Sequence, residues 1–323
     1  MALIGKIARK TLDTLDVYWT LIRIVVPVTI AAELLMRLGV IEAVSPLLAP
    51  IMGFYGLPAE LGLALLTGML VGVWGAVPMI FTLAPASSLT VADISVLSAL
   101  LLFAHGLPIE QKIVQKAGPG FLVTTLIRIA GGMIYAALLH QILAATGWLA
   151  QPLDPAWIPM SETTDWMGFL QGLFETAVTM LVILVVLAWG LELLKLSGLL
   201  DLLMASLNPL LRLAGIEGDA RHLTAIGMFL GISYGGGLLI RESRTGGIAP
   251  RQIFLSCVFM GFAHGIIEDT LLVMALGADF TAILVGRMIF AVAATALIAR
   301  LILRIPDRKF FLWMFGEKSP AGQ

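Results

Sequence analysis

Two histidines in repeated sequence surroundings are the residues best suited to carry chemistry. His105 and His264 both stand in the sequence Phe-Ala-His-Gly, each within an apolar stretch. An imidazole can bind a metal ion, carry a proton or hydrogen-bond to a solute near neutral pH. Glu268 follows His264 by four residues, which on a helix would place both on one face and suit a metal site or a proton relay. The alternative is that each histidine serves only hydrogen-bonded packing.

Acidic and arginine residues at matched distances from a turn form a second chemical pattern. Glu110 precedes, and Arg128 follows, the Gly-Pro-Gly turn at residues 118–120 by eight residues. At about 1.5 Å per helical residue both lie roughly 12 Å from the turn, so they can meet at one depth. Asp269 and Arg287 repeat the arrangement later in the chain. Each pair either neutralises two buried charges or releases one member to bind a solute or a proton, and both interpretations stay open.

A shift of 159 residues aligns the two halves of the chain without a gap. Chance would match mostly leucines in an apolar sequence, whereas here glycines, prolines and charged residues recur in register. Ile109 stands where the second half has Glu268, so the acidic pattern around the histidines is not symmetric and the metal question stays open. We expect Glu33 and Glu192, which also align, to face the protein interior. The same shift aligns His105 with His264 and Arg128 with Arg287.

The composition places the chain in a lipid bilayer. Of its 323 residues, 59% are hydrophobic and 13% are charged, against about 45–50% and 25% in soluble domains. A net charge of −1 provides no clustered basic surface, which excludes nucleic acid as a partner. The single cysteine, Cys257, rules out an intrachain disulfide and a thiolate metal cluster, and no cofactor is expected. The expected partners are lipid and a small solute, with protons or another coupling ion and a homo-oligomer left open.

Each half contains four apolar stretches long enough to be membrane segments. In the first half they are residues 18–42, 59–83, 91–117 and 120–149, and the second half has their shifted copies. A shorter apolar segment at residues 43–56 suits an interfacial helix better than a membrane span.

The distribution of basic residues predicts that the two halves are inserted in opposite orientations. No lysine or arginine occurs between Arg37 and Lys112, whereas the matching part of the second half has five arginines. Because cytoplasmic loops collect lysine and arginine, equivalent segments should face opposite sides. Basic residues near both ends place both termini in the cytoplasm, at the inner membrane of a bacterial cell. An inverted half must cross the membrane an odd number of times, so one of its four stretches must enter and leave by the same face.

The second stretch of each half is the candidate for this re-entrant hairpin. It is interrupted at Gly72 to Pro78 in the first half and at Gly231 to Gly237 in the second. Non-helical backbone at membrane depth is tolerated only where it is buried in protein or lines a cavity, and paired breaks of this kind point to a substrate site. The predicted substrate-binding residues lie in the breaks or near the histidines: His105, His264, Gly75, Pro78, Ser233, Gly235, Gly236 and Glu268.

An intramembrane hydrolase is a competing hypothesis. Gly231 to Gly235 fits the pattern Gly-x-Ser-x-Gly, with Ser233 as nucleophile and His264 as base. Ser233 aligns with Trp74, however, so what recurs between the halves is glycine, as a backbone break requires. We therefore expect no enzymatic activity.

The broken segment also resembles that of a known family. Residues 74–78, Trp-Gly-Ala-Val-Pro, look like the Gly-Cys-Asn-Val-Pro motif of the bacterial ferrous-iron transporter, with Gly75 and Ala76 replacing Cys and Asn. With the Ala-His-Gly sequences, this resembles the nucleoside-recognition (gate) domain membrane proteins, which include that transporter and spore maturation proteins A and B. No nucleotide-binding Gly-x-x-x-x-Gly-Lys-Ser/Thr sequence is present. The resemblance implies transport gated by hairpins.

The sequence therefore predicts an all-α membrane protein of two inverted-topology repeats, each with three transmembrane helices, one re-entrant hairpin and an interfacial helix. The predicted parts are a first repeat at 1–150, an extracytoplasmic linker at 151–166, a second repeat at 167–309 and a cytoplasmic tail at 310–323. The expected function is that of a secondary transporter, or a subunit of one, for a small polar or ionic solute. The alternative is a membrane assembly or signalling component without transport.

Overall fold

The computed structural model describes residues 2–158 and 165–316, which fold mostly into helices. Within these ranges, the side chains of residues 2–10, 13, 42, 233–235, 244 and 245 lie outside the description. The expected all-helical class is confirmed for the described part of the chain.

The first half runs from a long helix through a shorter one to two pairs of helices and a second long helix. In chain order these elements are α1 (Ala2–Arg37), α2 (Val40–Phe54), α3 (Leu61–Val71), α4 (Val73–Leu83), the short η1 (Ala86–Ser88), α5 (Val91–Ala104), α6 (Leu107–Lys116) and α7 (Phe121–Thr146).

The second half follows the same order, with the counterpart of α2 divided in two. Its elements are α8 (Trp166–Leu196), α9 (Leu199–Ser206), α10 (Asn208–Leu213), α11 (Asp219–Leu230), α12 (Ile232–Thr245), α13 (Pro250–Phe262), α14 (Glu268–Ala275), η2 (Thr281–Gly286), α15 (Arg287–Leu303), α16 (Asp307–Phe310) and η3 (Phe311–Phe315).

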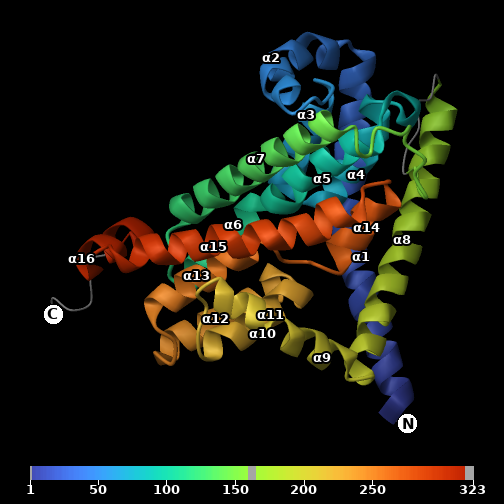
Figure 1. Cartoon of the computed structure of the whole chain (residues 1–323). Coiled ribbons are helices and arrows are strands. Elements are labelled where there is room, and N and C mark those ends of the chain that lie inside the picture. The colour runs from blue at the N-terminus through green and yellow to red at the C-terminus, as the bar shows by residue number, and fades with distance from the viewer. Residues whose placement is uncertain (1, 159–164, 317–323) are drawn as a thin grey trace.

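The long helices α1 and α8 lie side by side and run in opposite directions along one side of the molecule (Figure 1). The Tyr18 hydroxyl donates a hydrogen bond of 3.1 Å to the carbonyl of Ala177, its own counterpart under the 159-residue shift. Helix α2 lies at one end of the molecule, and α9 and α10 lie toward the other (Figure 1). Helix α2 and its counterparts α9 and α10 are therefore placed at opposite ends of the fold.

Five helical segments of the described chain are long and apolar enough to cross a membrane, where six spans were expected. The sixth expected span, residues 250–276, is divided because the chain between α13 and α14 is not helical. The interval between α5 and α6 is a similar but shorter break. The five segments are Thr14–Arg37, Val91–Lys116, Phe121–Thr146, Trp166–Leu196 and Thr281–Leu303.

The second stretch of each half is broken at a single glycine. Gly72, with φ of 122°, separates α3 from α4, and Gly231, with φ of 83°, separates α11 from α12. These angles favour glycine because a Cβ would be strained there. The two helices of each pair pack against each other, as expected of a hairpin. The expectation that the break extends to Pro78 or Gly237 is wrong, since both residues lie inside the helices that follow.

An aromatic cluster occupies the centre, next to the breaks that follow α5 and α13. The Phe103 ring lies 5.4 Å from that of Tyr135, 5.6 Å from that of Phe262 and 5.6 Å from that of Phe290, measured between ring centroids. The Tyr135 hydroxyl donates a hydrogen bond to the carbonyl of Ala282. Phe103 and Phe262 are counterparts in the two halves, so the cluster joins the halves directly.

The linker and the C-terminal segment pack on this helical core. The backbone N–H groups of Leu153 and Trp157 donate to the carbonyls of Leu89 and Ala275, each at 3.0 Å. Linker residues 159–164 lie outside the described residues. Near the other end, the N–H of Gly120 donates to the carbonyl of Met314 at 2.6 Å. The first residues of the predicted tail therefore contact the turn before α7.

Candidate functional site

The two histidines stand where the chain leaves α5 and α13. Helix α5 begins at a capping box in which Thr90 and Asp93 bond to each other's backbone N–H, and it ends directly before His105. The next residue, Gly106, has φ of 57°, and Gly265 after His264 has φ of 58°; both values favour glycine. The sequence expectation of one continuous helix through Ala-His-Gly is wrong in both halves.

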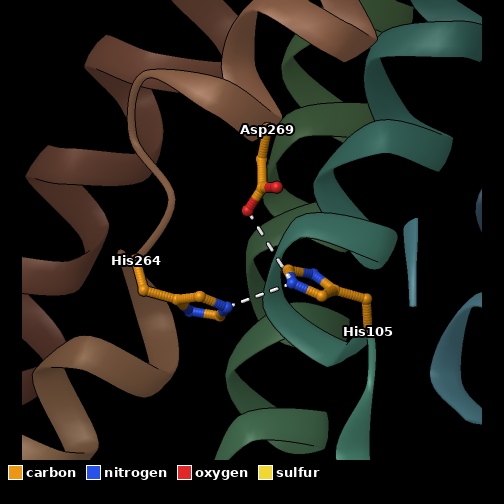
Figure 2. A group of neighbouring side chains, drawn as sticks. All are labelled: His105, His264 and Asp269. Atoms are coloured by element: carbon orange, nitrogen blue, oxygen red, sulfur yellow. Dashed lines mark hydrogen bonds and ion pairs between the residues drawn. The ribbon is translucent and has the colours of Figure 1, made fainter. Parts of the chain in front are cut away.

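The imidazole rings of the two histidines face each other (Figure 2). The Nδ1 of His105 lies 2.9 Å from the carbonyl of Leu101, and the Nδ1 of His264 lies 2.8 Å from that of Met260. Because a carbonyl only accepts, each Nδ1 is the protonated donor. The two Nε2 atoms are 3.1 Å apart. The expected convergence of His105 and His264 is what the structure has.

Two carboxylates complete a cluster around these nitrogens. Oε1 of Glu110 lies 3.3 Å from Nε2 of His264 and 3.5 Å from Nε2 of His105. Oδ2 of Asp269 lies 3.7 Å from Nε2 of His105 (Figure 2). Glu110 and Asp269 are counterparts, each in the first turn of its helix, where unpaired backbone N–H groups stabilise negative charge. The four side chains form a compact polar cluster that we call the His-acid cluster.

Arg128 holds the first half of this cluster in place. Its guanidinium is buried and donates to the carbonyls of Phe103 at 2.7 Å and His105 at 3.2 Å. Nη1 forms an ion pair of 2.6 Å with Oε2 of Glu110. These carbonyls lie at the end of α5 and have no helical partner. Arg128 therefore supplies their hydrogen-bond donors and also neutralises the charge of Glu110. The predicted approach of Glu110 and Arg128 at one depth is present.

Arg287 repeats only part of this arrangement. It donates to the carbonyls of Phe262 at 2.7 Å and His264 at 3.1 Å, as its counterpart does in the first half. A third bond of 2.9 Å goes to the carbonyl of Leu102, and Nη1 has no hydrogen-bond partner among the described residues. The predicted Asp269–Arg287 ion pair is therefore wrong for this conformation, because Asp269 turns toward His105 instead.

A cavity of about 330 Å³ lies beside the His-acid cluster. Both hairpin breaks reach it, at Gly72 and Gly231, and Gly75 is also part of its wall. Glu268 lines this cavity and a second one of about 210 Å³, which extends between α1 and α8 past Thr14. Glu268 does not share a helical face with His264, because the chain between them is not helical. It stands instead where the two cavities adjoin.

The remaining predicted residues lie away from the cluster or at its edge. Glu33 is buried on α1 and pairs with Arg37 one turn later at 2.6 Å, while Glu192 is half-buried on α8. Pro78 is buried inside α4. Gly236 packs so closely on Ile113 of α6 that a Cβ would lie 2.5 Å from its side chain. The side chain of Ser233, like the environment of Gly235, lies outside the described residues.

Two residues after His105 indicate the break in the helix there, although the apolar pattern continues through it. Gly106 is followed two residues later by Pro108, and glycine before proline is typical of one helix ending and another beginning. Trp74, which lines the cavity beside Glu268, was missed as a site residue because tryptophan in a membrane protein usually marks packing or an interface.

Comparisons with known proteins identify a membrane protein and give no activity. No protein-family model matches the chain, and no solved structure matches it. The chain is similar to the uncharacterized membrane protein YvoD of Bacillus subtilis (strain 168), with 27% identity over 290 residues that cover 87% of this chain and 90% of that protein. With its long apolar helices, this similarity establishes a multi-pass membrane protein.

Proposed function

We propose that the chain is a membrane transporter, or the membrane subunit of one, that moves a small polar or ionic solute through the cavity beside the His-acid cluster. One observation carries the proposal: both hairpin breaks and the central polar side chains converge on one cavity within apolar helices. Polar groups and broken backbone in a bilayer are costly unless protein, water or solute satisfies them. A wet, solute-binding cavity accounts for their being placed together.

We infer further that the two halves are inverted repeats, each with one re-entrant hairpin. Support comes from hydrogen bonds that recur under the 159-residue shift, such as those of Arg128 and Arg287 to the carbonyls that end α5 and α13. The antiparallel course of α1 and α8 supports it as well (Figure 1). Inverted repeats suit transport because one half can take up the conformation of the other, exposing a fixed site to either side.

Glu110 and Asp269 have different partners, and this difference supports an exchange of conformation between the two halves. Glu110 is bound to its arginine, whereas Asp269 faces His105 and its arginine has a nitrogen without a partner among the described residues. In the converse conformation Asp269 would bind Arg287 and Glu110 would be released. The two acids and the two arginines can then pair in two equivalent ways, one in each conformation. A switch between states requires such a bistable element.

The proposal includes an orientation in the inner membrane with both termini in the cytoplasm, which rests on the positions of lysine and arginine. With this orientation, the second cavity, near Thr14 of α1, lies toward the cytoplasm. Glu268 is then the first acid that a solute entering from that side meets. The resemblance to the nucleoside-recognition (gate) domain proteins is part of the proposal, and it supports gating by hairpins without indicating a solute.

Cysteine accessibility tests transport without knowledge of the solute. Val71 and Leu230 are counterparts that directly precede the two breaks and line the cavity. Each would be replaced by cysteine in a Cys257→Ser background and treated with a membrane-impermeant thiol reagent in right-side-out and inside-out vesicles. Leu126→Cys, on the exposed face of α7, is the matched control that should not react, since lipid covers it.

A transporter should show reaction at both positions from both sides, because the cavity opens alternately. Reaction in only one of the two vesicle preparations, or in neither, would contradict transport and favour the alternative of an assembly or signalling component.

A further inference from the structure

We propose that the His-acid cluster is a binding site for a divalent first-row transition-metal cation, with His105, His264, Glu110 and Asp269 as ligands, and that this cation is the transported solute. The cation as solute rests on the proposed function, whereas the binding site stands on geometry alone. All four side chains belong to described residues, and three of them appear in Figure 2.

The protonation of the histidines directs two lone pairs at one point. Each Nδ1 donates its proton to a carbonyl one helical turn earlier, so each neutral ring has its lone pair on Nε2. The two Nε2 atoms are only 3.1 Å apart. Two lone pairs at this distance repel unless a positive centre, a proton or a metal cation, lies between them. A metal cation provides that centre, and a histidine whose other N–H is held by a carbonyl is the usual form of a metal ligand.

The distances within the cluster match the edges of a tetrahedral site. With metal–ligand bonds of about 2.0–2.1 Å, the corners of a tetrahedron lie about 3.3–3.4 Å apart. The recorded separations are 3.1 Å between the two Nε2 atoms, and 3.3 Å and 3.5 Å from these atoms to Oε1 of Glu110. Oδ2 of Asp269 lies 3.7 Å from Nε2 of His105, and a carboxylate oxygen of Asp269 lies within 4.8 Å of a ring nitrogen of His264. Asp269 is then the fourth ligand of the tetrahedron.

The surroundings hold both carboxylates in position for this role. Arg128 binds Oε2 of Glu110 at 2.6 Å, which leaves Oε1 directed at the histidines. Asp269 packs against the backbone of Gly265 so closely that a Cβ there would lie 2.0 Å from Oδ2. The hydrogen bonds of Arg287 go to the carbonyls of Phe262, Leu102 and His264, and Oδ2 of Asp269 lies toward Nε2 of His105.

The donor set indicates the class of cation. Two imidazole nitrogens with two carboxylate oxygens suit zinc, cobalt, iron or nickel. Calcium takes six to eight oxygen ligands, and magnesium an octahedral oxygen shell, which four mixed donors do not supply. A thiolate is absent from the cluster, since Cys257 is buried within α13. Glu268, where the two cavities adjoin, places one more negative charge on the path to the site.

Cobalt titration of the full chain in lipid nanodiscs tests the site, because Co²⁺ in a tetrahedral site absorbs visible light strongly. The test variant is His105→Gln/His264→Gln. The matched control is His140→Gln/His222→Gln, which replaces the other two histidines of the chain; His140 packs at Gly56 and His222 is exposed. Helical content and elution volume establish that each variant is folded.

The wild type and the control should bind one Co²⁺ per chain with tetrahedral absorption bands. Zn²⁺ should displace this cobalt, and excess Mg²⁺ should not. In the test variant, the loss of affinity should exceed the roughly 10- to 100-fold that follows removal of an outer-shell partner. Asp269→Asn alone should weaken binding and change the absorption bands, since it replaces one ligand. Equal cobalt binding by wild type and test variant would overturn the site, as would displacement by Mg²⁺ as effective as that by Zn²⁺.

The result separates this proposal from the proposed function. If cobalt does not bind while Val71→Cys and Leu230→Cys still react from both sides, the cation is overturned and transport stands. If cobalt binds but the two cysteines react from one side only, the cation as transported solute is overturned with the transporter.

Discussion

The ion pair between Glu110 and Arg128 determines how single substitutions at the centre affect stability. Arg128→Met would leave the buried carboxylate without a partner, which costs about 3–5 kcal/mol in comparable cases. Adding Glu110→Gln should restore part of the lost stability, because it removes the unpaired carboxylate charge. The recovery should be incomplete, because the carbonyls of Phe103 and His105 still lack their donor. Thermal unfolding of the purified variants measures both effects. A double variant less stable than Arg128→Met would show that the two residues are not partners.

The counterpart arginine should behave differently. Arg287 makes three bonds to carbonyls and has no recorded ion pair with Asp269 among the described residues. Arg287→Met should therefore destabilise the protein, but adding Asp269→Asn should restore less stability than the equivalent addition does in the first half. The comparison uses the same two melting experiments. Equal recovery in both halves would mean that Asp269 and Arg287 are paired, and the asymmetry used in the proposed function would be absent.

At the scale of elements, the glycine after each histidine can be tested with its own counterpart as control. Gly106 and Gly265 have nearly equal φ values, 57° and 58°, so alanine at either position carries a similar backbone strain of about 1 kcal/mol. At Gly106 the added Cβ meets Glu110 at an ordinary 3.5 Å, whereas at Gly265 it meets Oδ2 of Asp269 at 2.0 Å. Gly265→Ala should reduce cobalt affinity well below that of Gly106→Ala. Equal affinities would show that Asp269 is not a ligand.

The elements also show what the sequence could and could not reveal. The breaks at Gly72 and Gly231 were predictable, because glycines recur at the same places in both halves. The breaks at His105 and His264 were not recognised, since the apolar run continues through them and hydrophobic pattern alone does not distinguish one long helix from two short ones. Packing decides the matter: the arginines from α7 and α15 bind the carbonyls that these breaks leave open. Such a contact depends on residues 25 positions away and is not visible in a local pattern.

For the whole molecule, opposite insertion of the halves has a direct test. Ser88 and Gly247 are exposed counterparts that lie in the connections after α4 and α12. Cysteine at position 88 should react with an impermeant reagent only from outside, and cysteine at position 247 only from the cytoplasm, because the arginines of the second half mark its loop as cytoplasmic. Both variants carry Cys257→Ser. Reaction of both from one face would exclude inverted repeats.

The coarse character of the molecule, an all-helical multi-pass membrane protein, was predictable from composition and apolar stretches. Only part of the His-acid cluster was predictable from the sequence. His105 and His264 were identified by their repeat, but the expected symmetric pairing of each acid with its own arginine holds in one half only. The sequence repeat predicts equal pairing in both halves, whereas the structure places Glu110 against Arg128 and Asp269 toward His105.

Solute uptake into proteoliposomes tests the central claim most directly, with Zn²⁺, uridine and succinate as parallel probes. Wild-type protein and the His140→Gln/His222→Gln control should admit Zn²⁺ faster than protein-free liposomes, as reported by an enclosed zinc-sensitive dye. His105→Gln/His264→Gln should admit it no faster than protein-free liposomes. Uptake of uridine or succinate in place of Zn²⁺, lost in the same variant, would leave the cavity as the transport site and reject the cation. No uptake of any probe by the wild type, or undiminished Zn²⁺ uptake by His105→Gln/His264→Gln, would contradict transport through this cavity.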